Sequence, residues 1–171
     1  MDEQANSAKK SHVLIMEDDL DQMSLLVDFV QTEIKNTINN EHIDADKKQM
    51  LLDIKIITVT NIASLRKAVA LHGNVLLAIL DCNIPDTRGG VPHDQFIKTN
   101  HLITGQHVAV DIVSNALPRT PITMISSLNR FQKIINVYYK NKYGFAINFI
   151  RKSDASTIQN NIGWYLRQFM K

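Results

Sequence analysis

The sequence predicts an α/β protein, a doubly wound parallel sheet of five strands with helices on both faces. Three observations lead to this prediction. Short apolar runs rich in β-branched residues recur five times, segments with helical spacing lie between them, and the two kinds of segment alternate. Near-continuous apolar runs are typical of strands buried on both faces, as in a parallel sheet. Alternation of strand and helix favours the doubly wound arrangement.

The predicted strands are short and carry few charged residues. They are HVLIM (12–16), IKIITV (54–59), VLLAIL (75–80), PITMIS (121–126) and AINFI (146–150). None of these runs approaches the roughly 20 apolar residues that a membrane-spanning helix needs. The apolar runs therefore predict the interior of a folded domain.

Amphipathic spacing predicts helices over 21–36, 61–72, 129–142 and 154–170. Asn61 and Asp154 stand at the start of two of them, where a side-chain oxygen can accept a hydrogen bond from the first turn. The apolar stripe of the last helix consists of Ile158, Ile162, Tyr165 and Phe169. Trp164 lies off this stripe, so the sequence leaves open whether it is partly packed or exposed.

Composition places the chain among ordinary globular proteins. Its 171 residues are 44% hydrophobic and 21% charged, which suits one domain with a proper core and excludes a disordered chain. Residues 1–11 are polar, lack the apolar core of a secretory signal, and are expected to form a flexible tail. The single cysteine, Cys82, excludes an internal disulfide framework and a multi-thiolate zinc site. We therefore expect a cytoplasmic protein.

Charge is distributed unevenly although the formal net charge is only +2. Residues 119–171 contain nine lysine or arginine residues and one acidic residue, Asp154. This asymmetry has two interpretations. The surface is either an ordinary mixture of charges, or the C-terminal third presents a basic face to an acidic partner.

Polar residues with complementary chemistry follow four of the predicted strands. Ligands of doubly wound sheets bind outside the carboxyl ends of the strands, so these residues are expected to lie together. Clustered carboxylates repel one another and need a hard cation, whereas a hydroxyl and an ammonium group suit a phosphoryl group. The pattern predicts a carboxylate that receives a phosphoryl group. The residues are Glu17, Asp18 and Asp19 after the first strand, Asp81 after the third, Ser126 and Ser127 after the fourth, and Lys152 after the fifth.

With these motifs the sequence resembles the receiver domain of bacterial two-component response regulators. The resemblance covers residues 12–171 and is carried by VLIMEDD, LDCNIPDTRGG, PITMISS and INFIRK. It implies the flavodoxin-like fold of receivers, with strand order 2-1-3-4-5.

The resemblance also implies a role for each matched residue. Asp81 would be the phosphoacceptor, and Lys152 and Ser126 would contact the phosphoryl group. Ser126 and Phe149 would form the conformational switch, although Phe149 lacks the hydroxyl of the commoner tyrosine. Ser153 departs from the family, because receivers usually have a proline after this lysine.

The implied cofactor is Mg²⁺. Its ligands would be the carboxylates of Asp18 and Asp81 and the backbone carbonyl of Asn83. Glu17 would bind the ion through a water molecule.

Two connections are longer than is usual in receivers. The first, 37–53, lies at the amino ends of the strands and is expected to be a structural loop. The second, 90–107, starts near the expected site. It is either a packed surface appendage or a lid or docking element. Its three histidines, His93, His101 and His107, are not spaced as a tight metal motif.

The resemblance implies a signalling protein that performs no catalysis beyond its own phosphorylation and slow dephosphorylation. The chain ends directly after the last predicted helix, so we expect a stand-alone receiver. Its partners would be a histidine kinase or histidine phosphotransfer protein, and an output protein bound through the basic face of residues 130–171. A membrane partner is not expected, nucleic acid is disfavoured, and a homodimer is left open.

Two alternatives remain at this point. The chain could be a receiver-like interaction module that is never phosphorylated. It could also be a phosphohydrolase with an aspartate nucleophile. Such enzymes typically need a second aspartate at the position of Asn83, which argues against this class.

Overall fold

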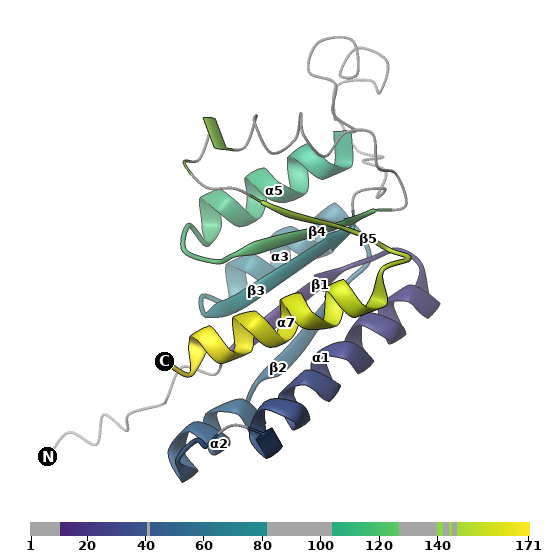
Figure 1. The fold of residues 1–171 in the computed structure, drawn as a ribbon. Helices are drawn as coiled ribbons and strands as arrows, with labels where there is room; N and C mark the ends of the chain where they lie inside the picture. Colours follow the sequence, from purple (N-terminus) through teal and green to yellow (C-terminus); the bar gives the residue numbers. More distant parts are fainter. Residues whose placement is uncertain (1–10, 41, 82–103, 127–139, 142–143, 145–146) are drawn as a thin grey trace, which may run out of the picture.

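Five parallel strands form one sheet in the order β2-β1-β3-β4-β5 (Figure 1). The computed structural model of the chain describes residues 11–40, 42–81, 104–126, 140–141, 144 and 147–171. The fold class and strand order predicted from the sequence are confirmed, and every strand falls on a predicted apolar run. The strands are β1 (His12–Met16), β2 (Lys55–Val59), β3 (Val75–Asp81), β4 (Ile122–Ser126) and β5 (Asn148–Arg151).

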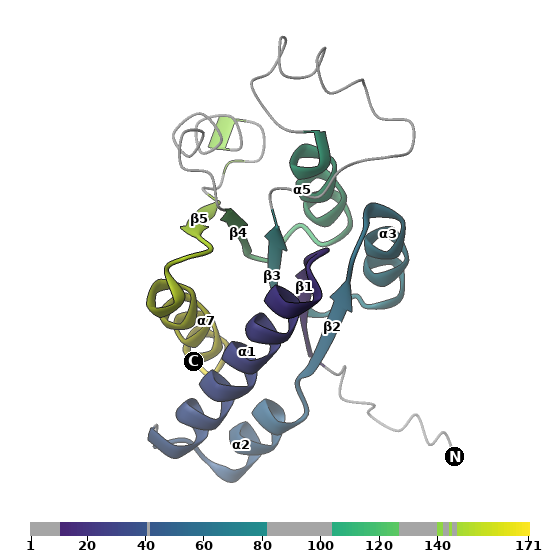
Figure 2. The same ribbon diagram turned by 90° about the vertical axis from the view of Figure 1, so that its right-hand side faces the viewer.

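Helices cover both faces of the sheet. One face is covered by α1 (Leu20–Asn40) and α7 (Ala155–Phe169), which lie side by side, and the other by α3 (Ile62–Leu71) and α5 (Thr104–Ala116) (Figures 1 and 2). The short helix α2 (Ala45–Leu52) lies next to α1 near the amino end of β2 (Figure 2). None of the described helices is long and apolar enough to cross a membrane.

The apolar runs arise because each strand faces two cores at once. Successive side chains of a strand point to opposite faces, so both sets must be apolar when both faces are covered. In β1, Leu14 and Met16 lie in the core beneath α3 and α5, whereas Val13 and Ile15 lie in the core beneath α1 and α7. The alternation continues in β3, where Ala78 and Leu80 face one core and Leu77 and Ile79 face the other.

The two predicted helix starts are confirmed. The Asn61 side chain accepts a hydrogen bond from the Ser64 amide at 2.9 Å, and Asp154 accepts one from the Thr157 amide at 3.0 Å. Within α7, Ile158 and Ile162 are buried as the stripe predicts. Trp164 is 50% exposed, so this residue is not part of the core.

The extension at 37–53 is largely helical, although the sequence suggested a loop. Helix α1 continues to Asn40, and α2 occupies much of the remainder. The physical reason is burial: Leu51 is fully buried and Ile38 and Ile43 pack against the core beneath α1. Apolar residues at these positions stabilise helical structure that propensity alone does not predict.

Ser11 belongs to the folded domain, although the sequence placed it in the tail. It is buried, its hydroxyl accepts a hydrogen bond from Asn74 at 3.0 Å, and its carbonyl accepts one from the Lys55 amide at 3.0 Å. Most of the second extension, 90–103, and most of the predicted helix at 129–142 lie outside the described residues.

The cap of α3 allows a direct test of the fold. Replacing Asn61 with alanine leaves the Ser64 amide without its acceptor, so we expect the free energy of unfolding to fall by about 1 kcal/mol. Urea denaturation followed by circular dichroism measures this change. Asn61→Ser keeps a capping oxygen and is expected to lose much less. Equal losses in the two variants would contradict the assigned cap.

Candidate functional site

The register of the central strands brings three carboxylates together. Met16 of β1 pairs with Leu80 of β3, so Glu17 and Asp81 come next to each other at the carboxyl edge of the sheet. Oxygens of Glu17, Asp18 and Asp81 all lie within 4.8 Å of one another. Glu17 is fully buried and Asp81 is 1% exposed, whereas Asp18 is exposed. Two buried carboxylates and one solvent-facing carboxylate form a donor set that suits a hard divalent cation.

Lys152 supplies the positive charge of this cluster. Its Nζ lies 2.9 Å from Oε1 and 2.8 Å from Oε2 of Glu17, and 3.0 Å from Oδ2 of Asp81. Its backbone amide donates to the carbonyl of Ser126 at 2.9 Å, which fixes the segment after β5 against the end of β4. One ammonium group therefore bridges the carboxylates that follow β1 and end β3.

Burial and the ion pairs act in opposite directions on these groups. Burial has the largest effect on the pKa of Glu17 and raises it. The hydrogen bond from Lys152 lowers this pKa and the charge of Asp81 raises it, and the resulting pKa is about 6. Burial lowers the pKa of Lys152, but the hydrogen bond to Glu17 and the charge of Asp81 outweigh it, so the pKa is raised. The lysine therefore stays charged, and Glu17 holds a proton more tightly than an ordinary glutamate.

The third acidic residue after β1 has a different role. Asp19 Oδ1 accepts hydrogen bonds from the amides of Asp21 at 2.9 Å and Gln22 at 3.1 Å, at the start of α1. A carboxylate in this position satisfies amides that have no partner within the helix. The sequence could not separate Asp19 from its two neighbours, because all three follow the same strand.

Ser126 and Phe149 lie where the sequence placed them along the strands. Ser126 ends β4, one residue beyond the partner of Asp81 in the register, and is 1% exposed. Phe149 is half-buried in β5 and packs against the core beneath α3 and α5. Asn83, Cys82 and Ser127 lie outside the described residues.

The sequence did not predict that the closest partner of Lys152 is Glu17. Glu17 was expected to contact a cation through water, but it forms two short contacts with the ammonium group. The two residues are far apart in the chain. The sequence predicts that they lie at the same edge of the sheet, but only the fold shows that they are in direct contact. The signal in the sequence that points to this contact is that both residues directly follow a strand.

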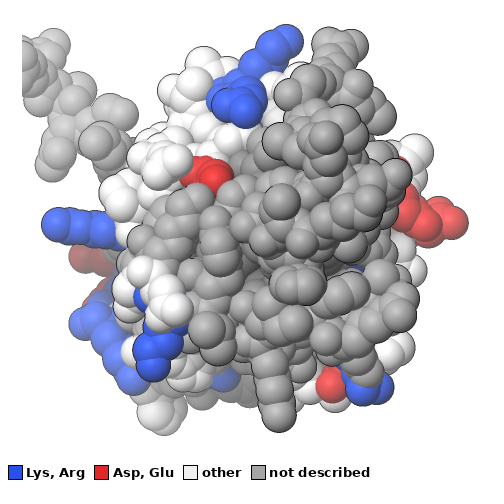
Figure 3. All heavy atoms as spheres, turned by 90° about the horizontal axis from the view of Figure 1, so that it is seen from above, with Lys and Arg blue, Asp and Glu red and all other residues white. Residues whose placement is uncertain are grey.

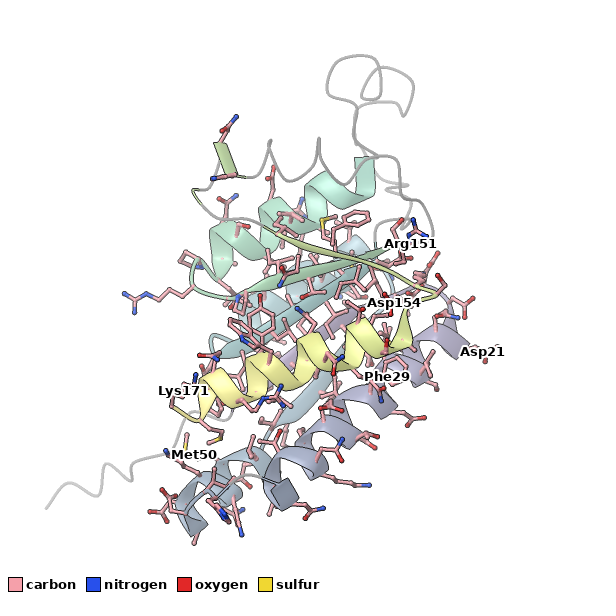
Figure 4. The ribbon with its side chains drawn as sticks, in the orientation of Figure 1. Asp21, Phe29, Met50, Arg151, Asp154 and Lys171 are labelled. Carbon is pink, nitrogen blue, oxygen red and sulfur yellow. The ribbon has the colours of Figure 1, made fainter. Side chains whose placement is uncertain are left out.

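The surroundings of the site are mixed in charge. Arg151 ends β5 and Asp154 caps α7, and both lie at the same end of the molecule as Asp21, whereas Met50 and Lys171 lie at the other end (Figure 4). On the face seen in Figure 3, described side chains of both charges are visible, mostly toward the rim, and several of the basic ones lie close together at the lower left. Four basic residues fall in the helix predicted over 129–142: Lys140 is described and exposed, and Arg130, Lys133 and Lys142 lie outside the described residues.

Comparison with known proteins identifies the fold. No family model matches the chain, and no curated protein matches it significantly. A chain in the crystal structure of the CheA3 P1 domain in complex with CheY6 from R. sphaeroides matches at 17% identity and a TM-score of 0.53, over 95% of this chain and 98% of that one.

Two isolated receiver domains agree with this match. A receiver domain from Rhodospirillum rubrum matches at 16% identity and a TM-score of 0.50, over 94% of this chain and 95% of that one. The receiver domain of NtrC4 from Aquifex aeolicus matches at 11% identity and a TM-score of 0.50, over 93% and 98%. The fold is therefore that of response regulator receiver domains.

Proposed function

We propose that this chain, which has the receiver fold, accepts a phosphoryl group on Asp81 in a two-component system or phosphorelay. One observation carries the proposal: the Asp81 carboxylate lies at the end of the central strand, 3.0 Å from the Lys152 ammonium and beside the carboxylates of Glu17 and Asp18. Burying two carboxylates side by side is unfavourable, because they repel each other and lose their hydration. Such an arrangement is therefore not expected at a strand end without a function.

The proposed donor is a phosphohistidine of a histidine kinase or histidine phosphotransfer protein. An oxygen of Asp81 attacks phosphorus, the phosphorus–nitrogen bond breaks, and the histidine ring keeps the electron pair. The Lys152 ammonium and the Ser126 hydroxyl would stabilise the phosphoryl oxygens. The matched structure that holds the CheA3 P1 domain with CheY6 makes this class of partner reasonable.

The proposed cofactor is Mg²⁺, and the donors at this edge fit such an ion. Asp18 and Asp81 would bind it directly and Glu17 through water, together with the backbone carbonyl of Asn83. When bound, the ion would offset negative charge on the phosphoryl group. The described residues themselves hold Asp81 in place and keep Lys152 beside it.

Signalling is proposed to occur by protein contact. Ser126 would move toward the phosphoryl group and Phe149 would turn further inward, which would change the surface around β5 and α7. An acidic output protein would bind the basic face of residues 130–171. Catalysis would be limited to self-phosphorylation and slow hydrolysis of the acyl phosphate.

Labelling with a small phosphodonor tests the proposed function. The purified chain is incubated with acetyl phosphate, with Mg²⁺ or with excess chelator, and its intact mass is measured. We expect one added phosphoryl group in the presence of Mg²⁺ and none with chelator. A chain that gains no mass under either condition would contradict the proposal and favour an interaction module that is not phosphorylated.

The acidic residues after β1 provide a matched pair for the metal site. We expect Asp18→Asn to weaken Mn²⁺ binding by about tenfold or more, because a direct anionic ligand is lost. Asp19→Asn is expected to bind Mn²⁺ nearly as well as the wild type, because asparagine also caps a helix. Free Mn²⁺ measured by electron paramagnetic resonance reports both affinities. Equal affinities in the two variants would place the metal elsewhere.

Metal binding is expected to depend on pH through Glu17. The pKa of Glu17 is raised to about 6, so the carboxylate is ionised at pH 8 and mostly protonated at pH 5. Binding of a cation requires the ionised form, so we expect Mn²⁺ affinity to fall about tenfold between pH 8 and pH 5 from this group alone. Glu17→Gln removes the titrating group and is expected to flatten the profile. An unchanged slope in this variant would contradict the role of Glu17.

A further inference from the structure

The outer edge of β2 is an unpaired strand edge in the part of the chain that the structure describes. β2 is the first strand of the sheet and pairs with β1 alone. The Lys55 amide donates to Ser11, and the Val59 carbonyl accepts from the Glu17 amide, so the backbone groups of these two residues point toward β1. Backbone direction alternates along a strand of a parallel pair. The N–H and C=O groups of Ile56 and Thr58 therefore point away from the sheet.

A mostly apolar groove lies beside this edge. It is lined by residues of α1, α2 and β2 and by Ile54, which precedes β2; most of them are apolar, and Gln31, Lys35 and Thr58 are polar. The extension at 37–53 contributes α2, which forms one wall of the groove. Leu52 lines the groove and is 63% exposed, and Met50 of the same helix is 46% exposed. Apolar surface next to unpaired backbone groups is the combination that recruits another strand.

β2 has few of the features that usually prevent edge pairing. Its middle residues, Ile56, Ile57 and Thr58, carry no charge, and the strand contains no proline. Its one charged residue, Lys55, lies at its amino end. Such an edge is open to a partner strand.

We infer that the edge of β2 is a homodimer interface, in which β2 pairs antiparallel with β2 of a second copy about a twofold axis at Ile57. In this register Ile56 of each copy stands opposite Thr58 of the other, and their outward groups form four backbone hydrogen bonds. Lys55 stands opposite Val59 of the other copy, so no like charges are opposed. One contact covers both apolar grooves, because each copy contributes the same surface.

The choice of a second copy follows from this self-complementarity. The outward groups are placed symmetrically about Ile57, and the strand that would match them in length, spacing and charge is β2 itself. The inference does not rest on the proposed function, since it involves neither Asp81 nor the metal.

The experiment measures the mass of the full chain in solution without Mg²⁺ or a phosphodonor. Sedimentation equilibrium is expected to show a rise from 19.4 kDa toward twice that mass as concentration increases. Thr58→Pro removes an outward N–H from each copy and leaves the bonds between β1 and β2 intact, as edge positions tolerate. We expect it to weaken the dimer about tenfold or more, because two intermolecular bonds are lost. Thr58→Val keeps these bonds and is expected to dimerise like the wild type.

A cysteine on the axis tests the register. In a Cys82→Ser background, Ile57→Cys places two thiols across a non-hydrogen-bonded pair, where Cα atoms lie about 4.5 Å apart and a disulfide can form. Lys55→Cys is the control, because its two copies lie at opposite ends of the paired strands. We expect rapid disulfide formation in the first variant and little in the second.

Several results would overturn the inference. These are a mass that stays at 19.4 kDa at every concentration, equal dimerisation of Thr58→Pro and Thr58→Val, or faster cross-linking at position 55 than at position 57. If Thr58→Pro proves unfolded by circular dichroism, Thr58→Lys replaces it, because a charge at this exposed position opposes edge pairing. Asp81→Asn is expected to dimerise like the wild type, because Asp81 is not part of the interface. Failure of phosphorylation with retained dimerisation would contradict the proposed function and leave the interface standing.

Discussion

Asp81→Asn is expected to abolish formation of the acyl phosphate. The amide is nearly the same size as the carboxylate but is a poor nucleophile, so the fold should remain while phosphorylation is lost. Intact mass after incubation with acetyl phosphate and Mg²⁺ should show no added phosphoryl group. We expect thermal stability to be equal to or above that of the wild type, because the variant removes one of two buried carboxylates that repel each other.

The matched control is Asp18→Asn assayed at saturating Mg²⁺. It removes a neighbouring carboxylate but leaves Asp81 in place, so slow labelling should remain. A full mass gain in Asp81→Asn would contradict the assignment of the phosphoacceptor. Peptide mapping would then show whether a nearby serine or threonine had accepted the group instead.

Lys152→Met is expected to cause the largest loss of stability. It leaves the carboxylates of Glu17, which is fully buried, and Asp81, which is 1% exposed, without their shared cation. Breaking a buried ion pair on one side typically costs about 3 kcal/mol or more. We expect a loss of that size in urea denaturation at pH 7.5 without divalent ions. Arg151→Met, which removes the exposed cation of the adjacent residue, should change stability little.

Acid and metal are expected to restore the Lys152→Met variant. Without the lysine, the pKa of Glu17 should rise above the value of about 6 that it has in the wild type. A raised carboxyl pKa in the folded state means that the folded state binds the proton more tightly than the unfolded state. Stability should therefore increase as pH falls from that raised pKa toward the ordinary value near 4.5.

Mg²⁺ should also stabilise Lys152→Met more than the wild type, since the ion replaces the missing positive charge. A variant that is as stable as the wild type at pH 7.5, or that is further destabilised on mild acidification, would contradict this account of the cluster. Phosphorylation of the variant should be strongly reduced even when Mg²⁺ restores its stability, because Lys152 no longer stabilises the phosphoryl group.

Local chemistry was sufficient to predict the five strands and the starts of two helices. The apolar runs around Leu14, Leu77 and Ile125 could be assigned to strands because every position in them faces a core. Asn61 and Asp154 could be assigned to helix starts because a cap depends on a side chain and an amide only three residues apart. The positions of Glu17, Asp81, Ser126 and Lys152 at strand ends followed from the same runs.

Local sequence could not predict the course of the 37–53 extension. Its helices are stabilised by Ile38, Ile43 and Leu51, which pack against residues distant in the chain. Helix propensity is weak compared with such packing, so the sequence favoured a loop. The sequence likewise could not predict that α2 forms one wall of the groove beside β2.

The sequence by itself determined the sheet, the strand ends and the set of chemical groups at the carboxyl edge. Tertiary structure decided how that set is divided. In the fold, Asp19 caps α1 and Asp18 is exposed to solvent. Lys152 forms ion pairs with Glu17 as well as with Asp81. The physical reason is that strand ends fix which residues meet. Which carboxylate is desolvated, and which is nearest the ammonium group, depends on distances of a few ångströms that only strand register and packing establish.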